Sequence, residues 1–229
     1  PVLVGWAYTY MEQILQIFIF TVITMLALLV FHFRKAYGVL IPLGGVLVST
    51  IWGLGIISLL GYNLDPLGLV IPFLIAARAM SHGVQLVERY YAETRELGSG
   101  PKAAKATFDS LFRPGSLGVV SDAIGLSLIA IGSIPLNTHL GIYASLWAIT
   151  VVFTVLIGVP LLLSILPTPK DPNLRETALR HIGASCSRTV ARPGAAKVVL
   201  SVAALAMAAG LLAASNVQIG DSEPGSPIL

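Results

Sequence analysis

Six long runs of apolar residues dominate this sequence, and short polar or basic segments separate them. A membrane-spanning helix needs about 20 apolar residues, because each residue adds about 1.5 Å and the hydrocarbon core is about 30 Å thick. Each run therefore predicts one transmembrane helix. The predicted spans are Ile14–Phe33, Val39–Leu60, Leu67–Leu97 (water-exposed after Arg89), Ser116–Ser133, Leu140–Leu166 and Ala195–Ala214.

The polar segments predict where helices end. Gly98–Pro101 ends the third span. A short amphipathic segment, Lys102–Phe112, is predicted to stand apart from the fourth span, because Arg113–Gly115 contains a proline and a glycine. Asp171 and Pro172 predict a helix start. The four-residue apolar spacing over Leu174–Val190, with arginines around it, predicts a basic helix that lies on the membrane surface.

Composition agrees with the apolar runs. The 229 residues are 55% hydrophobic and 11% charged, with a mean hydropathy of +0.85, whereas a soluble domain has about 25% charged residues. The predicted fold class is an all-α integral membrane protein with six transmembrane helices. The sequence begins at Pro1 without a Met, so we expect it to be an internal piece of a longer protein. Its single cysteine, Cys186, excludes an intramolecular disulfide framework.

Basic residues gather in every second loop. Thirteen of the fourteen Lys and Arg residues lie in the loops after the first, third and fifth spans, or at the adjoining helix ends. The positive-inside rule therefore predicts that these loops are cytoplasmic and that both ends of the sequence lie on the opposite side. The fourteenth basic residue, Arg78, lies inside the third span.

The third span carries a polar face. Its members are Arg78, Ser81, His82 and Gln85, at spacings of three, four and seven residues from the first. A charge near the bilayer centre costs at least ~2.5 kcal/mol, so these side chains are expected to face protein or water. Consecutive spans are antiparallel, and helical rise places Arg78 about 13 Å and Asp122 about 9 Å from the cytoplasmic helix ends. Asp122 is therefore predicted to lie at the depth of Arg78 and His82 and, if the two helix faces meet, to join both.

Two interpretations of this polar group remain open. In the first, a structural ion pair fixes the register of the two helices, since an unpaired buried charge is far costlier than a paired one. In the second, Asp122 and His82 change protonation during a transport cycle, while Arg78 keeps its charge. Beside Asp122, four small residues predict a face for helix packing: Gly118, Ser121, Gly125 and Gly132.

Several function classes have no support in the sequence. It contains no zinc-ligand spacing, nucleotide-binding loop, nucleophile motif or calcium-binding loop. We therefore expect no catalytic residues, metal or cofactor, and the protein is not predicted to be an enzyme. Membrane topology and anionic lipids explain the basic loops, so no nucleic-acid partner is expected.

Several motifs carry a family resemblance. Leu67–Tyr90, with Pro72 at its head and Gly83, Leu86 and Arg89-Tyr90 at its foot, resembles the fourth transmembrane helix of RND-superfamily exporters. The similarity is closest to the MMPL-like lipid exporters and the sterol-sensing-domain branch. The fourth span with Gly125, the fifth span with Pro160-Leu161-Leu162 and the tail Ile219–Gly225 are similar to the segments that follow in that family.

The resemblance implies a domain plan. The chain would hold helices two to seven of a twelve-helix transporter, of which the first five form a sterol-sensing-domain-like half-bundle. The implied domains are residues 1–13, the end of a periplasmic domain; 14–166, the five-helix unit; 167–194, a cytoplasmic linker with the basic interfacial helix; 195–215, the sixth transmembrane helix; and 216–229, the start of a second periplasmic domain.

The resemblance also implies a function. Family members export lipids, hydrophobic compounds or drugs, driven by the proton gradient, and the implied location is the bacterial inner membrane. The implied partners are membrane lipids, a hydrophobic or amphipathic substrate and the missing second half of the polypeptide, with an oligomer as a further possibility. The alternative is a non-transporting sterol-sensing-like module that binds lipid or a protein partner.

One departure from the family pattern bears on this choice. The family commonly has an Asp-Tyr or Asp-Asp pair, whose acid couples transport to protons, in the helix that corresponds to the third span. Ser81 and His82 occupy those positions here. Asp122, at matching depth on the next helix, is our hypothesis for a replacement of the lost acid.

Overall fold

The computed structural model describes residues 11–62, 68–132, 135–169, 183–188, 192 and 194–214. Among these residues the structure contains helices and no strands, and six helical stretches are long and apolar enough to cross a membrane. The protein is therefore an all-α integral membrane protein, and the prediction of six spans is confirmed. The elements are α2 (Met11–Phe33), α3 (Ala36–Leu59), α4 (Val70–Leu97), α5 (Gly100–Leu128), the 3₁₀ turn η1 (Ile129–Ile131), α6 (Pro135–Val151), the π-helical segment η2 (Val152–Ile157), α7 (Gly158–Ile165) and α9 (Ala195–Ala214).

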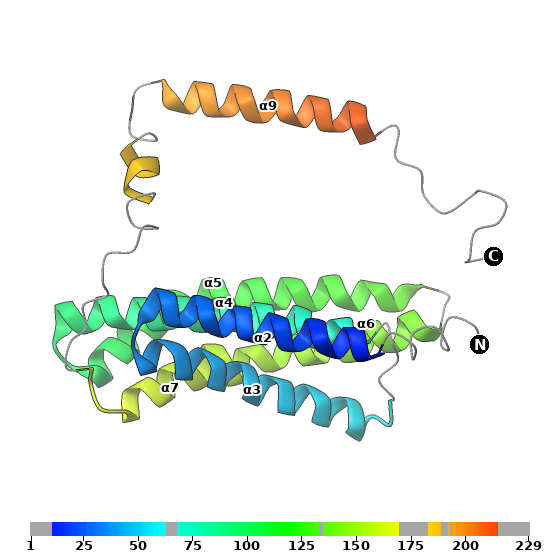
Figure 1. The fold of residues 1–229 in the computed structure, drawn as a ribbon, viewed down its shortest axis with the longest axis horizontal. Helices are drawn as coiled ribbons and strands as arrows, with labels where there is room; N and C mark the ends of the chain where they lie inside the picture. Colours follow the sequence, from blue (N-terminus) through cyan, green and yellow to red (C-terminus); the bar gives the residue numbers. More distant parts are fainter. Residues whose placement is uncertain are drawn as a thin grey trace. The chain divides into compact units, whose positions relative to one another are not determined.

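The chain divides into two compact units, Pro1–Arg175 and Glu176–Leu229. In the first unit α2 to α7 lie side by side as a bundle (Figure 1). In the second unit α9 is apolar apart from Lys197 and Ser201 near its start, and it buries none of its side chains within the structure. The predicted interfacial helix falls mostly outside the described residues, although residues 183–188 are helical and exposed. Most of the predicted flanking segments, residues 1–13 and 216–229, also lie outside the described residues.

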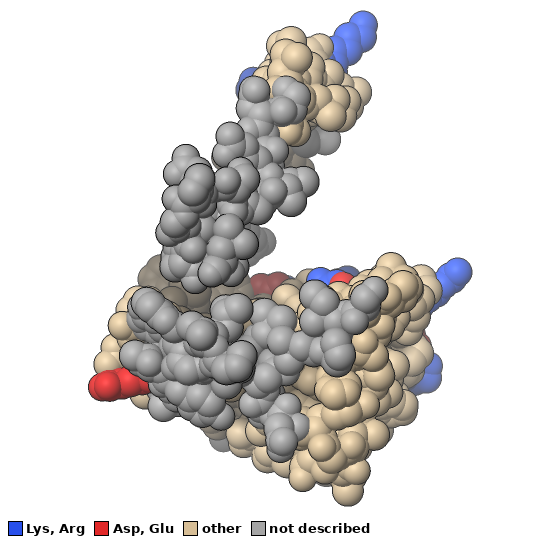
Figure 2. Space-filling model, turned by 90° about the vertical axis from the view of Figure 1, so that its right-hand side faces the viewer, with Lys and Arg blue, Asp and Glu red and all other residues tan. Residues whose placement is uncertain are grey.

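Apolar side chains cover the bundle. Many large aliphatic and aromatic residues of α2, α3 and α5 are exposed. Figure 2 faces the end of the bundle where α2 and α4 begin, and few charged side chains appear there among the described residues. An apolar exterior suits contact with lipid tails. Charged residues concentrate at the end of the bundle where α2, α4 and α7 end and α3 and α5 begin, and we refer to it as the basic end. Its basic residues include Arg34, Lys35, Arg89, Lys102 and Arg113.

One helix replaces two predicted elements. The prediction of a break at Arg113–Gly115 is wrong, because α5 runs without interruption from Gly100 to Leu128 and holds Pro114 in its interior. Packing explains the continuity: a Cβ at Gly115 would lie 2.8 Å from the Cδ2 of Leu156, so the glycine lets α5 lie close to η2. The prediction that this helix extends to Ser133 is also wrong, since α5 changes at Ile129 into the turn η1.

The fifth span begins earlier than predicted and is not uniform. It starts at Pro135 rather than Leu140, which agrees with the preference of proline for the first turn of a helix. Its middle is the π-helical segment η2, where the backbone N–H of Gly158 donates to the carbonyl oxygen of Phe153, five residues back. A π-helical turn contains an extra residue compared with an α-helical turn, and such turns are often found at functional sites.

Glycines bring α3 close to its neighbours. Trp147 of α6 is fully buried, and a Cβ at Gly53 would lie 2.0 Å from its Cε2 atom. On the α4 side, a Cβ at Gly83 would lie 3.1 Å from the Cα of Pro42. These two positions let α3 pack closely against both α4 and α6.

By contrast, α2 lies at the edge of the bundle and contacts α4 near both of its ends. The rings of Phe18 and Phe73 pack edge to face at 5.2 Å, and His32 Nε2 lies 2.6 Å from Glu88 Oε1. Phe18 precedes His32 by 14 residues and Phe73 precedes Glu88 by 15. The two helices therefore run parallel, as alternate helices of an up-and-down membrane bundle must.

Candidate functional site

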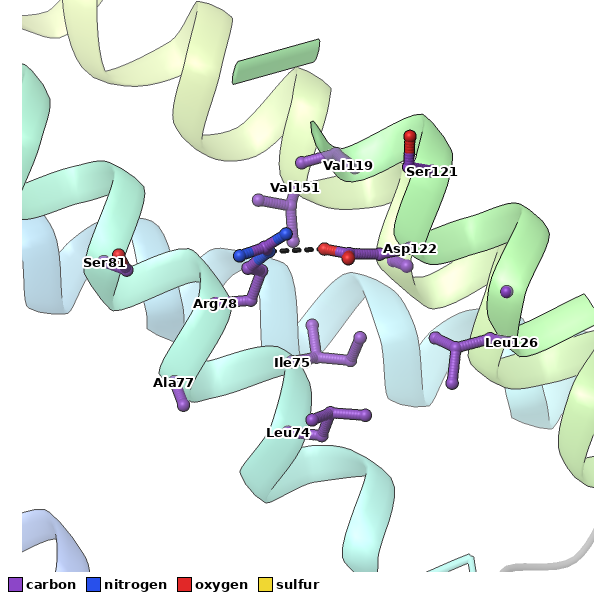
Figure 3. A pocket seen from close by; sticks show the side chains of 12 residues that line it. Leu74, Ile75, Ala77, Arg78, Ser81, Val119, Ser121, Asp122, Leu126 and Val151 are labelled. Carbon is purple, nitrogen blue, oxygen red and sulfur yellow. Dashed lines mark hydrogen bonds and ion pairs between the residues drawn. The ribbon is translucent and has the colours of Figure 1, made fainter. Parts of the chain in front are cut away.

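A cavity lies between α4 and α5, with α6 at its back (Figure 3). Its volume is about 560 Å³ and it opens on the surface of the first unit. Most of its walls are apolar. The lining residues are Leu74, Ile75, Ala77, Arg78 and Ser81 of α4, Val119, Ser121, Asp122, Gly125 and Leu126 of α5, and Ala148 and Val151 of α6.

An ion pair crosses this cavity. Arg78 and Asp122 point towards each other from α4 and α5, and Arg78 Nε donates a hydrogen bond to Asp122 Oδ2 (Figure 3). Gly118 lies beside the guanidinium, since a Cβ there would be in ordinary van der Waals contact with Arg78 Nη2, at 3.8 Å. The pair lies within two membrane spans, where either charge alone would be far costlier than the pair.

The ion pair is partly open to the surroundings. The Arg78 side chain is 43% exposed and the Asp122 side chain 36% exposed within the first unit. A charged group that faces lipid tails near the bilayer centre costs at least ~2.5 kcal/mol, so these two side chains are not expected to face lipid. Water, ligand or a further protein segment must therefore cover the opening in the membrane.

The other residues of the predicted polar face are placed differently. Ser81 lines the cavity beside Arg78. His82 is buried, does not line the cavity, and its Nε2 has no hydrogen-bond partner among the described residues. Gln85 is exposed and lies two helical turns from Arg78, towards the basic end of α4. The structure thus joins Arg78 to Asp122 and leaves His82 outside that hydrogen bond.

The four small residues predicted as a packing face have different surroundings. Gly118 lies under the guanidinium of Arg78, while Ser121 and Gly125 line the cavity. No described atom lies within 4 Å of a Cβ built at Gly125, and Gly132 follows η1 near Asn137. A shared role of these residues in helix packing stays a prediction.

The arrangement combines a proton-binding group with space for an apolar ligand. A carboxylate that is partly exposed can exchange a proton with water, whereas the guanidinium stays charged. Apolar walls with a few converging polar groups are typical of small-molecule sites. The cavity can therefore hold a proton on Asp122, an apolar group against α6, or both.

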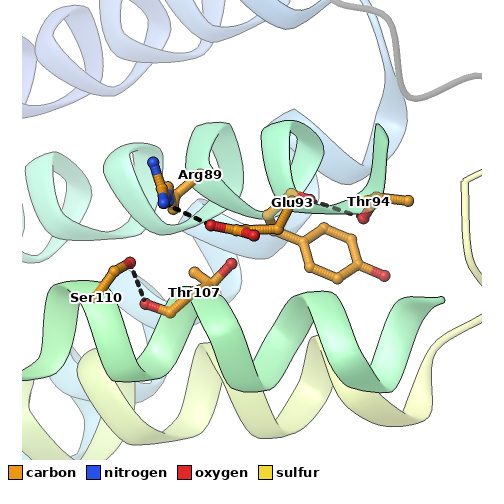
Figure 4. A network of polar contacts seen from close by, with 6 residues as sticks. Arg89, Glu93, Thr94, Thr107 and Ser110 are labelled. Carbon is orange, nitrogen blue, oxygen red and sulfur yellow. Dashed lines mark hydrogen bonds and ion pairs between the residues drawn. The ribbon is translucent and has the colours of Figure 1, made fainter. Parts of the chain in front are cut away.

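Polar contacts at the basic end form a second group that the sequence analysis did not identify (Figure 4). Arg89 Nη2 lies 2.6 Å from Glu93 Oε1, and the Glu93 side chain is only 10% exposed. Nearby, Thr94 Oγ1 donates to the carbonyl oxygen of Tyr90 at 2.7 Å. The four-residue spacing of Arg89 and Glu93 was a usable signal for this pair. His32 and Glu88 gave no such signal, because 56 residues separate them.

Comparisons with known proteins give little beyond membrane location. No family model matches this sequence, and no solved structure matches it. It is 29% identical over 122 residues to "Putative membrane protein MJ1562" from Methanocaldococcus jannaschii. The matched part is 52% of this chain and 31% of that protein, so the chain spans about a third of the length of this relative.

Proposed function

We propose that this chain is the transmembrane part of an RND-type secondary transporter in a bacterial inner membrane. It exports a lipid, a hydrophobic compound or a drug, and the proton gradient drives export. The observation that carries the proposal is the ion pair between Arg78 and Asp122 across an otherwise apolar cavity inside the membrane. Ionisable residues inside membrane spans commonly serve ion or substrate pathways.

In this proposal Asp122 is the coupling residue. Its carboxylate binds a proton on one side of the membrane and releases it on the other. Arg78 pairs with the carboxylate of Asp122, so protonation of Asp122 removes an ion pair between α4 and α5. A change in that contact is a means of altering how the two helices pack during the cycle.

His82 is a second group that can exchange protons in this proposal. It is buried one turn along α4 from Arg78 and lacks a hydrogen-bond partner on Nε2 in the described structure. An imidazole ring can both accept and donate a proton, which suits transfer to a carboxylate. Since Ser81 and His82 stand where the family acid pair is expected, Asp122 and His82 would together replace it.

Transport and proton flux in liposomes test the proposal. Full-length protein with Asp122→Asn is expected to lose at least about 90% of proton-driven transport, because an amide cannot exchange a proton. His82→Ala is expected to reduce it by a smaller factor. Asp109→Asn is the matched control, since Asp109 is an exposed carboxylate on α5 that pairs with Lys105. Full activity and proton dependence in both the Asp122 and His82 variants would refute the relay.

The alternative is a non-transporting sterol-sensing-like module that binds lipid or a protein partner. Serine and histidine at the positions of the family acid pair favour it. The same liposomes separate the two functions. A module of this kind would bind lipid but show neither substrate export nor proton flux in the wild-type protein.

A further inference from the structure

The ion pair leaves most of its hydrogen-bonding capacity unused. Arginine has five N–H donors, and Arg78 spends one of them on Asp122 in the described structure. Within the same part of the chain, Asp122 accepts only this bond and neither Ser81 nor Ser121 makes a side-chain hydrogen bond. Four groups with free donors or acceptors therefore lie in one cavity. Polar groups inside a membrane span are costly without partners, so the cavity is suited to a ligand with a polar head.

The remaining walls set the character of the rest of the ligand. Leu74 and Leu126 lie towards one end of the cavity, and Val151 of α6 forms part of its back. A volume of about 560 Å³ falls within the usual range for small-molecule sites, about 300–1,000 Å³. An alkyl chain suits these apolar walls, because it makes van der Waals contacts with them and needs no hydrogen bond.

The positive charge of Arg78 indicates which polar head group a ligand of this cavity would carry. Arg78 is the only basic residue inside the first five spans that lies away from the basic end. Its guanidinium binds carboxylates strongly, with room for two parallel hydrogen bonds. If a ligand carboxylate joined the pair while Asp122 stayed ionised, two anions would share one cation inside the membrane. Uptake of one proton by Asp122 removes that excess charge.

We propose that this cavity binds an anionic amphiphile, whose carboxylate pairs with Arg78 while Asp122 takes up one proton from water. The proton balance is one per ligand: the cavity holds one cation and one anion before and after binding. The site rests on the proposed function in that ligand binding and proton uptake would be two parts of one export cycle. It assigns the substrate class as a long-chain acid.

The charged groups around Asp122 are few. From α4, Arg78 faces it directly, and His82 lies within electrostatic reach without lining the cavity. From α6, Ala148 and Val151 line the cavity and carry no charge. Proton uptake on ligand binding is therefore expected at Asp122, with His82 as the group that must be tested beside it.

Direct binding in lipid nanodiscs tests the site, with the full-length protein, radiolabelled oleate as the acid probe and oleyl alcohol as the neutral probe. Wild-type protein is expected to bind oleate at least tenfold more tightly than oleyl alcohol. Its affinity for ionised oleate should rise as the pH falls, by up to tenfold per pH unit. Asp122→Asn mimics the protonated acid, so it should bind oleate severalfold more tightly and lose the pH dependence. His82→Gln should keep that dependence.

Removing the cation gives the complementary result. Arg78→Gln is expected to weaken oleate binding at least tenfold and to leave oleyl alcohol unchanged. Because this variant leaves Asp122 without a partner and can fail to fold, the double variant Arg78→Gln/Asp122→Asn supplies a neutral cavity with the same expectation. Lys105→Gln, an exposed charge outside the cavity, is the control.

Several results would overturn the site. Equal affinity for the acid and the alcohol would exclude recognition of the anion, and so would unchanged oleate binding in the double variant. Weaker oleate binding in Asp122→Asn would exclude the proton exchange, and loss of the pH dependence in His82→Gln would assign the proton to His82. Failure of the proposed function is distinct: it would appear as oleate binding without export or proton flux.

Discussion

At the residue scale, Gly53 determines how closely α3 and α6 approach. Trp147 is the largest of the fully buried side chains among the described residues, and its indole ring occupies the space that a side chain at Gly53 would need. Helix contacts in membranes depend on such close approach, because burial from water supplies little driving force there. A single methyl group at this position therefore has a large effect.

We predict that Gly53→Ala destabilises the protein. The new Cβ would lie about 2.0 Å from the indole ring, and overpacking of this kind costs about 1–3 kcal/mol or more. The gain in helix propensity from glycine to alanine is at most about 1 kcal/mol, so the cost of the clash is expected to exceed it. Thermal unfolding of the detergent-solubilised protein, followed by loss of the monodisperse elution peak, measures the change.

Gly55 supplies a matched control on the same helix. Nothing lies within 4 Å of a Cβ at Gly55, so Gly55→Ala is expected to leave the melting temperature unchanged or to raise it slightly. Equal losses in the two variants would show that α3 tolerates no alanine, whatever the surroundings, and would remove the special role of Gly53.

At the scale of the element, α5 shows that packing can keep a helix continuous through a proline. Pro114 is exposed in the helix interior, and next to it Gly115 is buried against Leu156 of η2. Proline in a helix interior loses a hydrogen bond and costs about 3 kcal/mol. Contacts of α5 with α4, α6, η2 and α7 offset that loss.

Pro114→Ala is therefore predicted to stabilise the protein. Alanine restores the missing backbone hydrogen bond, and the exposed ring makes few contacts to lose. Pro42→Ala in α3 is the comparison, because Pro42 is buried and packs against Gly83. This variant is expected to be stabilised less than Pro114→Ala, or to be destabilised. The melting temperature of each variant, compared with that of the wild-type protein, tests this prediction. A clear decrease for Pro114→Ala would contradict it.

The number and approximate bounds of the spans could be predicted from the sequence, because length and hydropathy determine them locally. Ala195–Ala214 agrees at both ends, and the first span differs from α2 by three residues at its start. The predicted break at Arg113–Gly115 was wrong for a physical reason: local turn signals compete with tertiary contacts, and the contacts win here. The π-helical segment η2 packs against α3 and α5, and no local sequence pattern predicted it.

The site was predictable to a similar extent. Antiparallel order and helical rise placed Arg78 and Asp122 at similar depth, and the structure pairs them. The same reasoning could not separate His82 from that pair, because a difference of one turn of the helix changes which neighbour a side chain faces. The cavity itself depends on side-chain volumes from three helices, which sequence spacing does not give.

At the scale of the whole molecule, the ends of the bundle differ in charge. Lys and Arg residues concentrate at the basic end, whereas the rings of Tyr62 and His139 pack against each other at the other end with centroids 4.7 Å apart. From this difference the positive-inside rule predicts an orientation with the basic end in the cytoplasm. Opposite ends of the bundle should therefore react from opposite sides of the membrane.

Cysteine labelling tests this orientation. Cys186 is exposed and is the single cysteine of this sequence. In a full-length background without other cysteines, a membrane-impermeant maleimide is expected to label Cys186 and Glu96→Cys in inverted vesicles but not in intact cells. His139→Cys, in a background that also lacks Cys186, should show the reverse. Labelling of Glu96→Cys in intact cells would contradict the predicted topology.

The π-helical segment η2 has a consequence for how related chains should be compared. Its extra residue rotates everything before Val152 by about 100° relative to α7, since one residue of an α-helix turns the chain by that angle. A homologue with a plain α-helix here would be one residue shorter. An alignment that omits this single-residue gap between 151 and 158 would match lipid-facing positions with cavity-facing ones, and Val151 would be compared with the wrong residue.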